Sequence, residues 1–422
     1  MKKQNQNMLQ GPLVSNIILY TIPIILTSVL QLLFNAADLV VVGRYCGSVS
    51  VAAVGATGSI TNLIVNLFIG LSVGAGVTVA HALGGHEDEA VHRTVHTALP
   101  AALVSGVVLT IVGVAFSETF LRLMDTPENV LPLSTIYMKI YFGGMTFNMV
   151  YNFCASILRA AGDTKSPLIF LGISAVLVVI VLMRRNDACR LHLSKMRFYK
   201  VQLLKMLRIG LPAGIQGSMF SISNVLIQSS INSFGDVLMS GNAAAANIEG
   251  FVYAMVNAFH QTVVNFIGQN VGAHQYKRVR KILLICLISV SVAGVCGGLA
   301  ANLLGPSLLS IYITDSAEAI SYGMLRLAYV GIPYFICGLM DVSTGALRGM
   351  GASVVPMIIS VLGVCGIRIG WIYTIFQVQQ FHTPQCLYTS YPVSWAATFL
   401  AQLMAFWIVY RKHTKAVSCQ NA

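Results

Sequence analysis

Long apolar segments follow one another along almost the whole chain, and all but one of them are long enough to cross a lipid bilayer. Eleven such runs lie at residues 17–43, 51–80, 94–116, 134–157, 168–183, 209–234, 242–270, 282–304, 321–346, 354–376 and 392–410. A bilayer core of about 30 Å needs about 20 apolar residues in a helix, and a helix satisfies its own backbone hydrogen bonds within lipid. The runs therefore predict an all-α polytopic membrane protein.

The composition supports this fold class and argues against several functions. Of the 422 residues, 56% are hydrophobic and only 9% are charged, which is unlike an ordinary soluble enzyme. The formal net charge of +12 comes from Lys and Arg clusters between the apolar runs, a pattern typical of cytoplasmic loops rather than of a nucleic-acid-binding surface. The sequence has neither a Walker loop nor a nucleophile elbow, so we expect neither an ATP-driven pump nor an enzyme.

Neither the cysteines nor the N-terminus indicates processing. The nine cysteines lie mostly within apolar runs and lack metal-ligand spacing, so we expect no disulfide framework. The first residues, MKKQNQN, lead into an apolar run without a small-residue cleavage site. We therefore expect a retained first helix and no signal peptide.

The two halves of the sequence repeat each other. Four matched pairs recur at a distance of 188 or 189 positions: Pro23 and Pro212, Asn35 and Asn224, residues 84–86 and 272–274, and residues 158–162 and 347–351. Transporters built from such duplications bind their substrates near the membrane midplane, between the repeats. The repeat predicts an N-terminal lobe over residues 1–183, a cytoplasmic amphipathic linker over 184–208 and a C-terminal lobe over 209–422.

The first lobe is shorter than the second. After Pro356 the second lobe continues for 55 residues to Arg411, whereas after Pro167 the first lobe continues for only 17 residues to Arg184. We therefore expect about 38 residues, parts of the fifth and sixth helices, to be missing, with residues 168–183 as the fused remainder. A helix over fifteen of these residues is about 22 Å long. The positive-inside rule favours a run that does not cross the membrane.

The linker has a basic amphipathic pattern. Its cations Lys195, Arg197, Lys200 and Lys205 alternate with apolar side chains. Such a pattern is suited to lying on an anionic cytoplasmic leaflet.

Asp38 places a carboxylate inside the first apolar run. Carboxylates at membrane depth are costly and usually face a cavity or a partner, so Asp38 is a candidate for a coupling-ion or proton site. The alternative is a helix-end Asp near the surface, because Gly43 and Arg44 mark the aqueous edge about a turn away.

Several of these features together resemble the multidrug and toxic compound extrusion (MATE) transporters. The residues that carry the resemblance are Asn35 to Asp38, Gly43, Arg44, the turn 84–86 with His274, and the turns 158–163 and 347–351. The resemblance covers nearly the whole chain. It implies two six-helix lobes around a V-shaped cavity, and export of cationic or aromatic drugs and other xenobiotic compounds in exchange for protons or sodium.

The resemblance also implies a coupling site. Asp38 would be the ion-coupled carboxylate, with Asn35 beside it, and the only cofactor would be the proton or sodium ion itself. In several family members polar residues of the fifth helix join this site, whereas residues 168–182 of this chain offer only Ser174.

Six further polar, aromatic or sulfur-containing residues are candidates for the substrate cavity: Glu249, Gln228, Gln261, His260, Tyr253 and Met255. Glu249, followed by soft and aromatic side chains, is suited to receiving a cationic drug. The alternative is a first-turn Glu stabilised by the helix dipole. For His260 and the two glutamines, the alternative to lining the cavity is hydrogen bonding between helices.

Asp341 and Arg368 lie in different apolar runs of the second lobe. Because a buried charge needs a partner, we expect a structural ion pair between them rather than a substrate role.

One pattern resembles a metal site. His92 and His96 stand four residues apart, with Glu89 one turn earlier, which is ligand spacing on a helix. The matching positions of the second repeat are Arg280 and Leu284. Because the repeat keeps the segment without the ligands, we expect an amphipathic segment and no metal.

The expected location is the cell inner (plasma) membrane, with several spans and both termini cytoplasmic. The expected partners are small-molecule cationic or aromatic substrates and the lipid bilayer, with no nucleic acid, and the chain is expected to be a monomer. Two alternatives stay open. A flippase for lipid-linked precursors would be favoured by a strongly cationic cavity, and a chain with a shortened lobe is also compatible with a non-transporting remnant.

Overall fold

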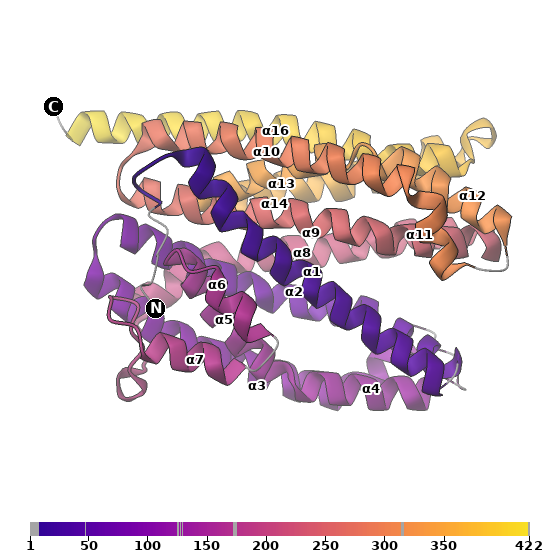
Figure 1. The fold of residues 1–422 in the computed structure, drawn as a ribbon, viewed down its shortest axis with the longest axis horizontal. Coiled ribbons are helices and arrows are strands. Elements are labelled where there is room, and N and C mark those ends of the chain that lie inside the picture. Colours follow the sequence, from indigo (N-terminus) through magenta and orange to yellow (C-terminus); the bar gives the residue numbers. More distant parts are fainter. Residues whose placement is uncertain are drawn as a thin grey trace. The chain divides into compact units, whose positions relative to one another are not determined.

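The computed structural model describes residues 8–46, 48–124, 126, 128, 130–171, 175–313 and 316–420. These residues form helices and connecting turns without a strand (Figure 1). Six helices within them are long and apolar enough to cross a membrane, and a seventh span results if the bent pair Ala317–Gly331 and Tyr334–Gly349 is counted as one. The predicted all-α, polytopic fold class is confirmed.

The chain divides into two compact units. Of the described residues, those within 29–221 form unit 1, and those within 8–28 and 222–420 form unit 2. The chain passes from one unit to the other inside two long helices, α1 (Leu13–Cys46) and α8 (Lys200–Asn232).

Unit 1 is built around four helices that pack on one another, α2 to α5. Its elements are α2 (Ser48–Gly84), α3 (Asp88–Leu123), α4 (Leu131–Gly143), α5 (Met145–Ala160), α6 (Lys165–Leu171), α7 (Ala175–Met183) and a 3-10 turn, Leu193–Lys195. Small residues and aliphatic side chains of α2, α3 and α5 form its main core.

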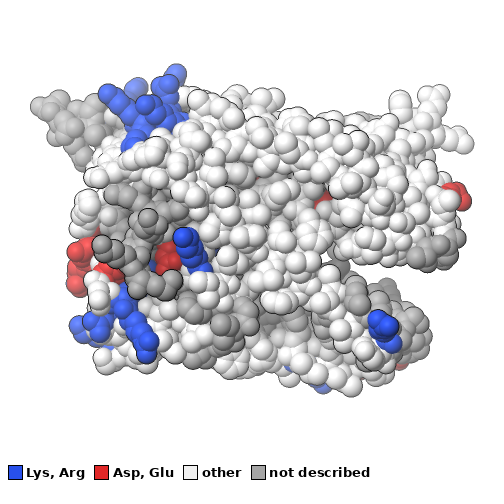
Figure 2. Space-filling view, in the orientation of Figure 1, with Lys and Arg blue, Asp and Glu red and all other residues white. Residues whose placement is uncertain are grey.

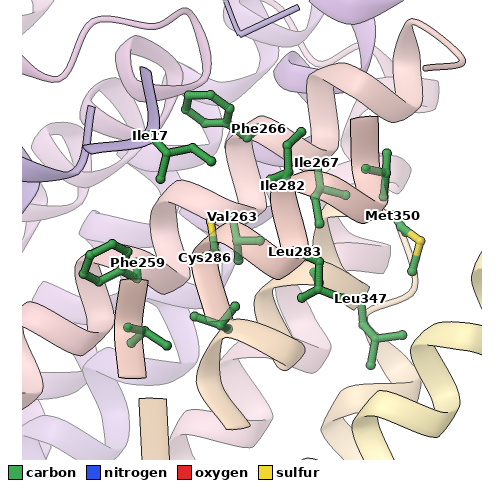
Figure 3. Close-up of a cluster of buried hydrophobic side chains, with 14 of the residues drawn as sticks. Ile17, Phe259, Val263, Phe266, Ile267, Ile282, Leu283, Cys286, Leu347 and Met350 are labelled. Carbon is green, nitrogen blue, oxygen red and sulfur yellow. The ribbon is translucent and has the colours of Figure 1, made fainter. Parts of the chain in front are cut away.

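Unit 2 has the longer series of helices. Its elements are α9 (Asp236–Gly272), α10 (Tyr276–Leu303), α11 (Gly305–Tyr312), α12 (Ala317–Arg326), a π-helical turn (Leu327–Gly331), α13 (Tyr334–Gly349), α14 (Val354–Ser360), a second π-helical turn (Val361–Gly366), α15 (Ile367–Tyr373), two 3-10 turns (Ile375–Gln377 and Gln379–Phe381) and α16 (Pro384–Gln420). Large apolar side chains of α9, α10 and α13 fill the centre of unit 2, together with Ile17 of α1 (Figure 3).

The predicted repeat is present in the order and length of the helices. Helices α2 and α9 both contain 37 residues, α5 and α13 both contain 16, and α6 and α14 both contain 7. Within unit 1, α2 packs on α3, α4 and α5, and within unit 2, α9 packs on the equivalent α10, α12 and α13.

The repeat extends to an uncommon backbone conformation. His86 and His274 both have φ of 56°, in the left-handed region that L side chains rarely adopt. Each His follows the end of a helix, and the next N–H donates back to the helix, from Glu87 to the carbonyl of Ala82 and from Gln275 to that of Asn270. This is the pattern of a Schellman cap, here with His in the position usually taken by Gly.

Two helices, α6 and α7, are described within the short fifth run, on either side of residues that lie outside the described part of the chain. Helix α6 corresponds to α14, and α7 packs on α5 as α16 packs on α13. The arrangement agrees with a fused remainder of two helices, but the loss of about 38 residues and the non-crossing of this run stay predictions.

The linker begins as a folded loop on unit 1 rather than as a helix. Arg185 is fully buried, and its guanidinium group binds Asp187 through Nε at 2.9 Å. The backbone N–H of His192 donates to Nε2 of His96 at 2.9 Å, and that of Tyr199 donates to Oγ1 of Thr97 at 3.1 Å. The rest of the basic pattern belongs to the first turns of α8. The cytoplasmic location of the linker stays a prediction.

Candidate functional site

Polar side chains form a row along α9. From Glu249, every fourth residue is polar or carries a hydroxyl, through Tyr253, Asn257, Gln261 and Asn265. Residues four apart are neighbours on a helix surface, and the row winds gradually around α9 because each step of four residues turns it by about 40°. Asn257 Nδ2 donates to the hydroxyl of Tyr253 at 3.4 Å, and Gln261 Nε2 donates to Oδ1 of Asn257 at 2.8 Å. This row, the polar stripe, is about 24 Å long at 1.5 Å per residue and so covers most of a bilayer core.

The polar stripe is absent from the equivalent helix of the first repeat. The residues 188 positions earlier, on α2, are Thr61, Val65, Ile69, Val73 and Val77. Since the two helices have the same length and the same packing neighbours, the fold does not require the polar residues. The polar stripe is therefore a functional candidate rather than a structural necessity.

Glu249, at the start of the polar stripe, forms a buried ion pair. Arg326, the last residue of α12, donates from Nε to Oε1 of Glu249 at 3.0 Å and from Nη2 to Oε2 at 2.7 Å. The side chains are only 9% and 5% exposed. Two parallel, charge-assisted hydrogen bonds fix both groups. Helix α9 begins at Asp236, so the alternative of a first-turn Glu249 is wrong.

Asn242 extends the ion pair into a network. Its Oδ1 accepts a hydrogen bond from Arg326 Nη1 at 2.6 Å and one from the Tyr388 hydroxyl at 3.2 Å. Its Nδ2 donates to Oε1 of Gln228 at 3.3 Å. The structure therefore joins two predicted residues, Glu249 and Gln228, through Arg326 and Asn242, which sequence reasoning missed, as it did Tyr388. Arg326 offered a signal, because it is a cation inside an apolar run.

Arg368 occupies a second buried position in unit 2. Its guanidinium carbon lies 4.2 Å from the ring centre of Tyr391 and 5.6 Å from that of Trp395, and its Nε donates to Oγ of Ser394 at 3.0 Å. Cation–π contacts of this kind hold a guanidinium group without a carboxylate. The ion pairs among the described residues do not include Arg368.

The predicted ion pair between Asp341 and Arg368 is therefore wrong. The guanidinium group of Arg368 instead packs on the aromatic rings of α16, which stabilise it without a carboxylate. Asp341 lies on α13 two turns before Arg348, the cation that acts on it electrostatically.

His260 connects α9 to α13. Its Nδ1 lies 2.7 Å from the backbone oxygen of Asp341, and its Nε2 lies 3.3 Å from Nη1 of Arg348. A carbonyl only accepts and a guanidinium group only donates, so Nδ1 carries the proton and Nε2 accepts. His260 thus makes the interhelical hydrogen bonds that were the alternative to cavity lining. Met255 packs beside the apolar cluster of α9, α11 and α12.

Two of the three buried arginines in the described part of unit 2 lie beside π-helical turns. Arg326 directly precedes Leu327–Gly331, and Arg368 follows Val361–Gly366 by two positions. The described part of unit 1 contains no such turn. Because π-turns are rare and occur often at functional sites, they support the assignment of a site to this region of unit 2.

The predicted coupling residues lie on α1. Asn35 is exposed, whereas the side chain of Asp38 and all of Ser174 lie outside the described residues. The coupling site therefore stays a prediction.

The histidines of α3 serve another purpose than metal binding. His96 is buried and both its ring nitrogens are engaged, Nδ1 with the carbonyl of His92 at 2.7 Å and Nε2 with the N–H of His192 at 2.9 Å. His96 thus holds the linker and has no lone pair free for a metal. Within the described ranges no cluster of three or more potential ligands was found.

Comparison with known proteins decides the family. A family model described as MatE matches residues 23–183 and 212–374. The chain belongs to the MatE family. The two matched segments start 189 positions apart, at Pro23 and Pro212, so the family model itself matches the two repeats of this MatE protein.

Relatives and solved structures extend this result over the full length. The MatE protein is 23% identical over 438 residues to "Probable multidrug resistance protein YoeA" of Bacillus subtilis (strain 168), covering 93% of each chain. It is similar, with a TM-score of 0.87 and 17% identity, to a solved "multidrug resistance MATE family transporter of the MOP superfamily" in an outward-facing conformation, covering 98% of this chain and 100% of that chain.

A second solved structure is that of a MOP superfamily transporter from Pyrococcus furiosus Vc1, described by "reverse polarity of binding pocket", with a TM-score of 0.83, 17% identity and full coverage of both chains. At these identities the structures establish the fold alone. With its apolar helices, the MatE protein is a multi-pass membrane protein.

Proposed function

We propose that this MatE protein is a secondary exporter of cationic or aromatic drugs and other toxic compounds, driven by inward flow of protons or sodium. The polar stripe of α9 with the buried Glu249–Arg326 pair carries the proposal, because the first repeat lacks both. Charged side chains at membrane depth are costly and typically belong to substrate or ion pathways. The names of the relative YoeA and of the outward-facing transporter support this substrate class.

In this proposal a cationic compound competes with Arg326 for the carboxylate of Glu249. The guanidinium group of Arg326 already lies near the rings of Tyr388 and Tyr391, 5.8 and 5.6 Å from their centres. Ring faces attract organic cations in the same way. Arg326 therefore limits which compounds bind. A substrate binds only when its interactions with Glu249 and the tyrosine rings are stronger than those of Arg326.

The coupling ion enters the proposal through Asp38 and Asn35, and no other cofactor is part of it. The proposed location is the inner (plasma) membrane, as a monomer with both termini cytoplasmic. The basic clusters between apolar runs support this orientation.

The test is efflux from proteoliposomes that contain the purified protein. Ethidium export should follow an imposed pH or sodium gradient, and Glu249→Gln should reduce ethidium export more than export of a neutral aromatic dye, because the lost attraction is electrostatic. Glu118→Gln is the matched control, since it removes one carboxylate from an exposed ion pair with Arg122. Gradient-independent dye movement, or equal loss for both dyes, contradicts the proposal.

A second candidate is a flippase for lipid-linked, anionic precursors. The observation that favours it is the positive balance of the buried charges, because Arg326 neutralises Glu249 while Arg368 has only aromatic and hydroxyl partners among the described residues. A guanidinium group is well suited to phosphate. The structure of reversed pocket polarity from Pyrococcus furiosus is a precedent for such a difference within the superfamily.

The two candidates predict opposite effects of the same variants. If the protein moves lipid-linked precursors, Arg368→Gln abolishes transbilayer movement of a fluorescent polyprenyl pyrophosphate in proteoliposomes while Glu249→Gln retains it. If it exports cationic drugs, Glu249→Gln is the more damaging change, and no polyprenyl pyrophosphate moves.

A further inference from the structure

The N-terminal end of α10 and the C-terminal end of α16 carry exposed cations without acidic neighbours on either helix. The cations are Lys277, Arg280, Lys281, Arg411 and Lys412, all exposed. Neither helix contains an Asp or Glu, and the ion pairs found among the described residues include none of these five. Figure 2 shows a patch of Lys and Arg at this end of unit 2 with no acidic atoms among them.

Aromatic contacts hold the two helix ends together. The hydroxyl of Tyr410 donates to the backbone oxygen of Tyr276 at 3.3 Å, and the ring of His413 lies 5.9 Å from that of Tyr276. The guanidinium carbon of Arg280 lies 5.6 Å from the ring centre of Trp407. Tryptophan is typical of the membrane–water interface. The cations are therefore gathered at a fixed place, at the depth where lipid head groups lie.

Exposed apolar rows continue from the cations along both helices. On α10, Arg280 is followed at four-residue spacing by Leu284, Ile288 and Val292, and on α16, Lys412 is preceded at the same spacing by Ile408, Met404 and Leu400. From its cation to its farthest apolar residue, each row spans twelve positions, which is about 18 Å along the helix. This is close to the half-thickness, about 15 Å, of a bilayer core, and so to the length of lipid acyl chains.

The first repeat lacks this arrangement. The positions 188 residues before Lys277, Arg280 and Lys281 are Glu89, His92 and Arg93, and there Arg93 binds Glu89 at 2.7 Å. The positive-inside rule explains why basic residues occur at the start of α10 and at the equivalent start of α3. It does not explain why the cluster lacks acidic residues in the second repeat only.

We propose that the ends of α10 and α16 bind the phosphate head group of an anionic phospholipid, with the acyl chains along the two apolar rows. The cations supply charge complementarity to the phosphate, Trp407 sets the interfacial depth, and the rows contact hydrocarbon. The site lies outside the Glu249–Arg326 network and does not depend on the transported substrate.

The experiment is native mass spectrometry of the purified full chain, released from mixed micelles of phosphatidylglycerol and phosphatidylcholine. We expect retention of phosphatidylglycerol in preference to phosphatidylcholine. The double change Arg280→Gln, Lys412→Gln should lower its affinity about thirtyfold, since each interfacial cation contributes about 1 kcal/mol. The matched control is Lys139→Gln, Lys165→Gln, which removes two exposed cations from α4 and α6.

Several outcomes overturn the proposal. They are equal retention of the two lipids, equal losses in the two double variants, and protection from thermal unfolding by inorganic phosphate as large as that by the lipid. If the double variant is poorly folded, Arg280→Lys decides instead, because it keeps the charge and should retain the lipid. Loss of lipid from Arg280→Lys with an unchanged elution profile would assign Arg280 a packing role on Trp407 only.

Discussion

Arg326 holds the carboxylate of Glu249 with two nitrogens, Nε at 3.0 Å and Nη2 at 2.7 Å, across 77 positions of sequence. Both side chains are almost completely shielded from water. Removal of one partner leaves a buried charge uncompensated, which typically costs about 3 to 5 kcal/mol, whereas removal of both costs much less.

The first prediction follows from this pair. Arg326→Gln should lower the stability of the detergent-solubilised protein by about 3 kcal/mol, and the double change with Glu249→Gln should recover much of the loss. Thermal unfolding monitored by size-exclusion chromatography measures both. In addition, Arg326→Gln should bind ethidium more tightly, because Glu249 then has no internal competitor. Additive losses in the double variant would show that the pair is not coupled.

The second prediction concerns the coupling carboxylate. Asp38→Asn should abolish gradient-driven efflux while leaving membrane insertion intact, because the amide keeps the shape and loses the titratable charge. Dye efflux under imposed pH and sodium gradients measures it, with the amount of protein in the membrane as the control. Efflux that still follows the gradient would remove Asp38 from the coupling site.

A third prediction concerns pH and the linker. Burial and the nearby cations Arg190 and Lys195 lower the pKa of His192, so its neutral form is favoured in the folded loop. The packing of the loop is therefore strongest above the ordinary His pKa of about 6.5 and weakens as the pH falls below it.

Hydrogen exchange of the backbone amides in residues 189–199 checks this expectation. Exchange corrected for its intrinsic pH dependence should be faster at pH 5.5 than at pH 7.5, and His96→Leu should give fast exchange at both values. Equal protection at both pH values would mean that the histidines do not hold the loop.

The fourth prediction concerns topology. Lys195→Cys should resist an impermeant thiol reagent added to intact cells, because the fifth apolar run is expected not to cross and the linker is expected to be cytoplasmic. Lysed cells provide the positive control. Labelling from outside would show that the run crosses the membrane and that the orientation of the second lobe is reversed.

The sequence predicted the helical architecture and the repeat well, because both depend on local patterns. Apolar runs define helices, and the paired turns at His86 and His274 recur with the same φ of 56°. Partners were predicted poorly. A charged residue in an apolar run indicates that a partner exists, but which helix supplies it depends on tertiary packing, so Arg368 was paired with Asp341 and Glu249 was left without Arg326.

The linker shows a second limit of sequence reasoning. The alternating cations and apolar residues predict an amphipathic linker, and the four cations of that pattern are exposed, but the pattern does not indicate that Arg185 is buried or that the loop is held to α3 through His96 and Thr97. The hydrogen bonds that decide this conformation come from backbone N–H groups, which every residue but proline has. No side-chain pattern could have indicated them.

The left-handed histidine turn and the polar stripe of α9 have different histories. A conformation present at the same position in both halves is most simply inherited from the single half-length ancestor, so the turns of His86 and His274 predate the duplication. The polar stripe is confined to one half and therefore arose, or was lost from the other copy, afterwards. After duplication, one copy was free to become scaffold while its twin acquired the chemistry, and mutational tolerance should differ between α2 and α9 accordingly.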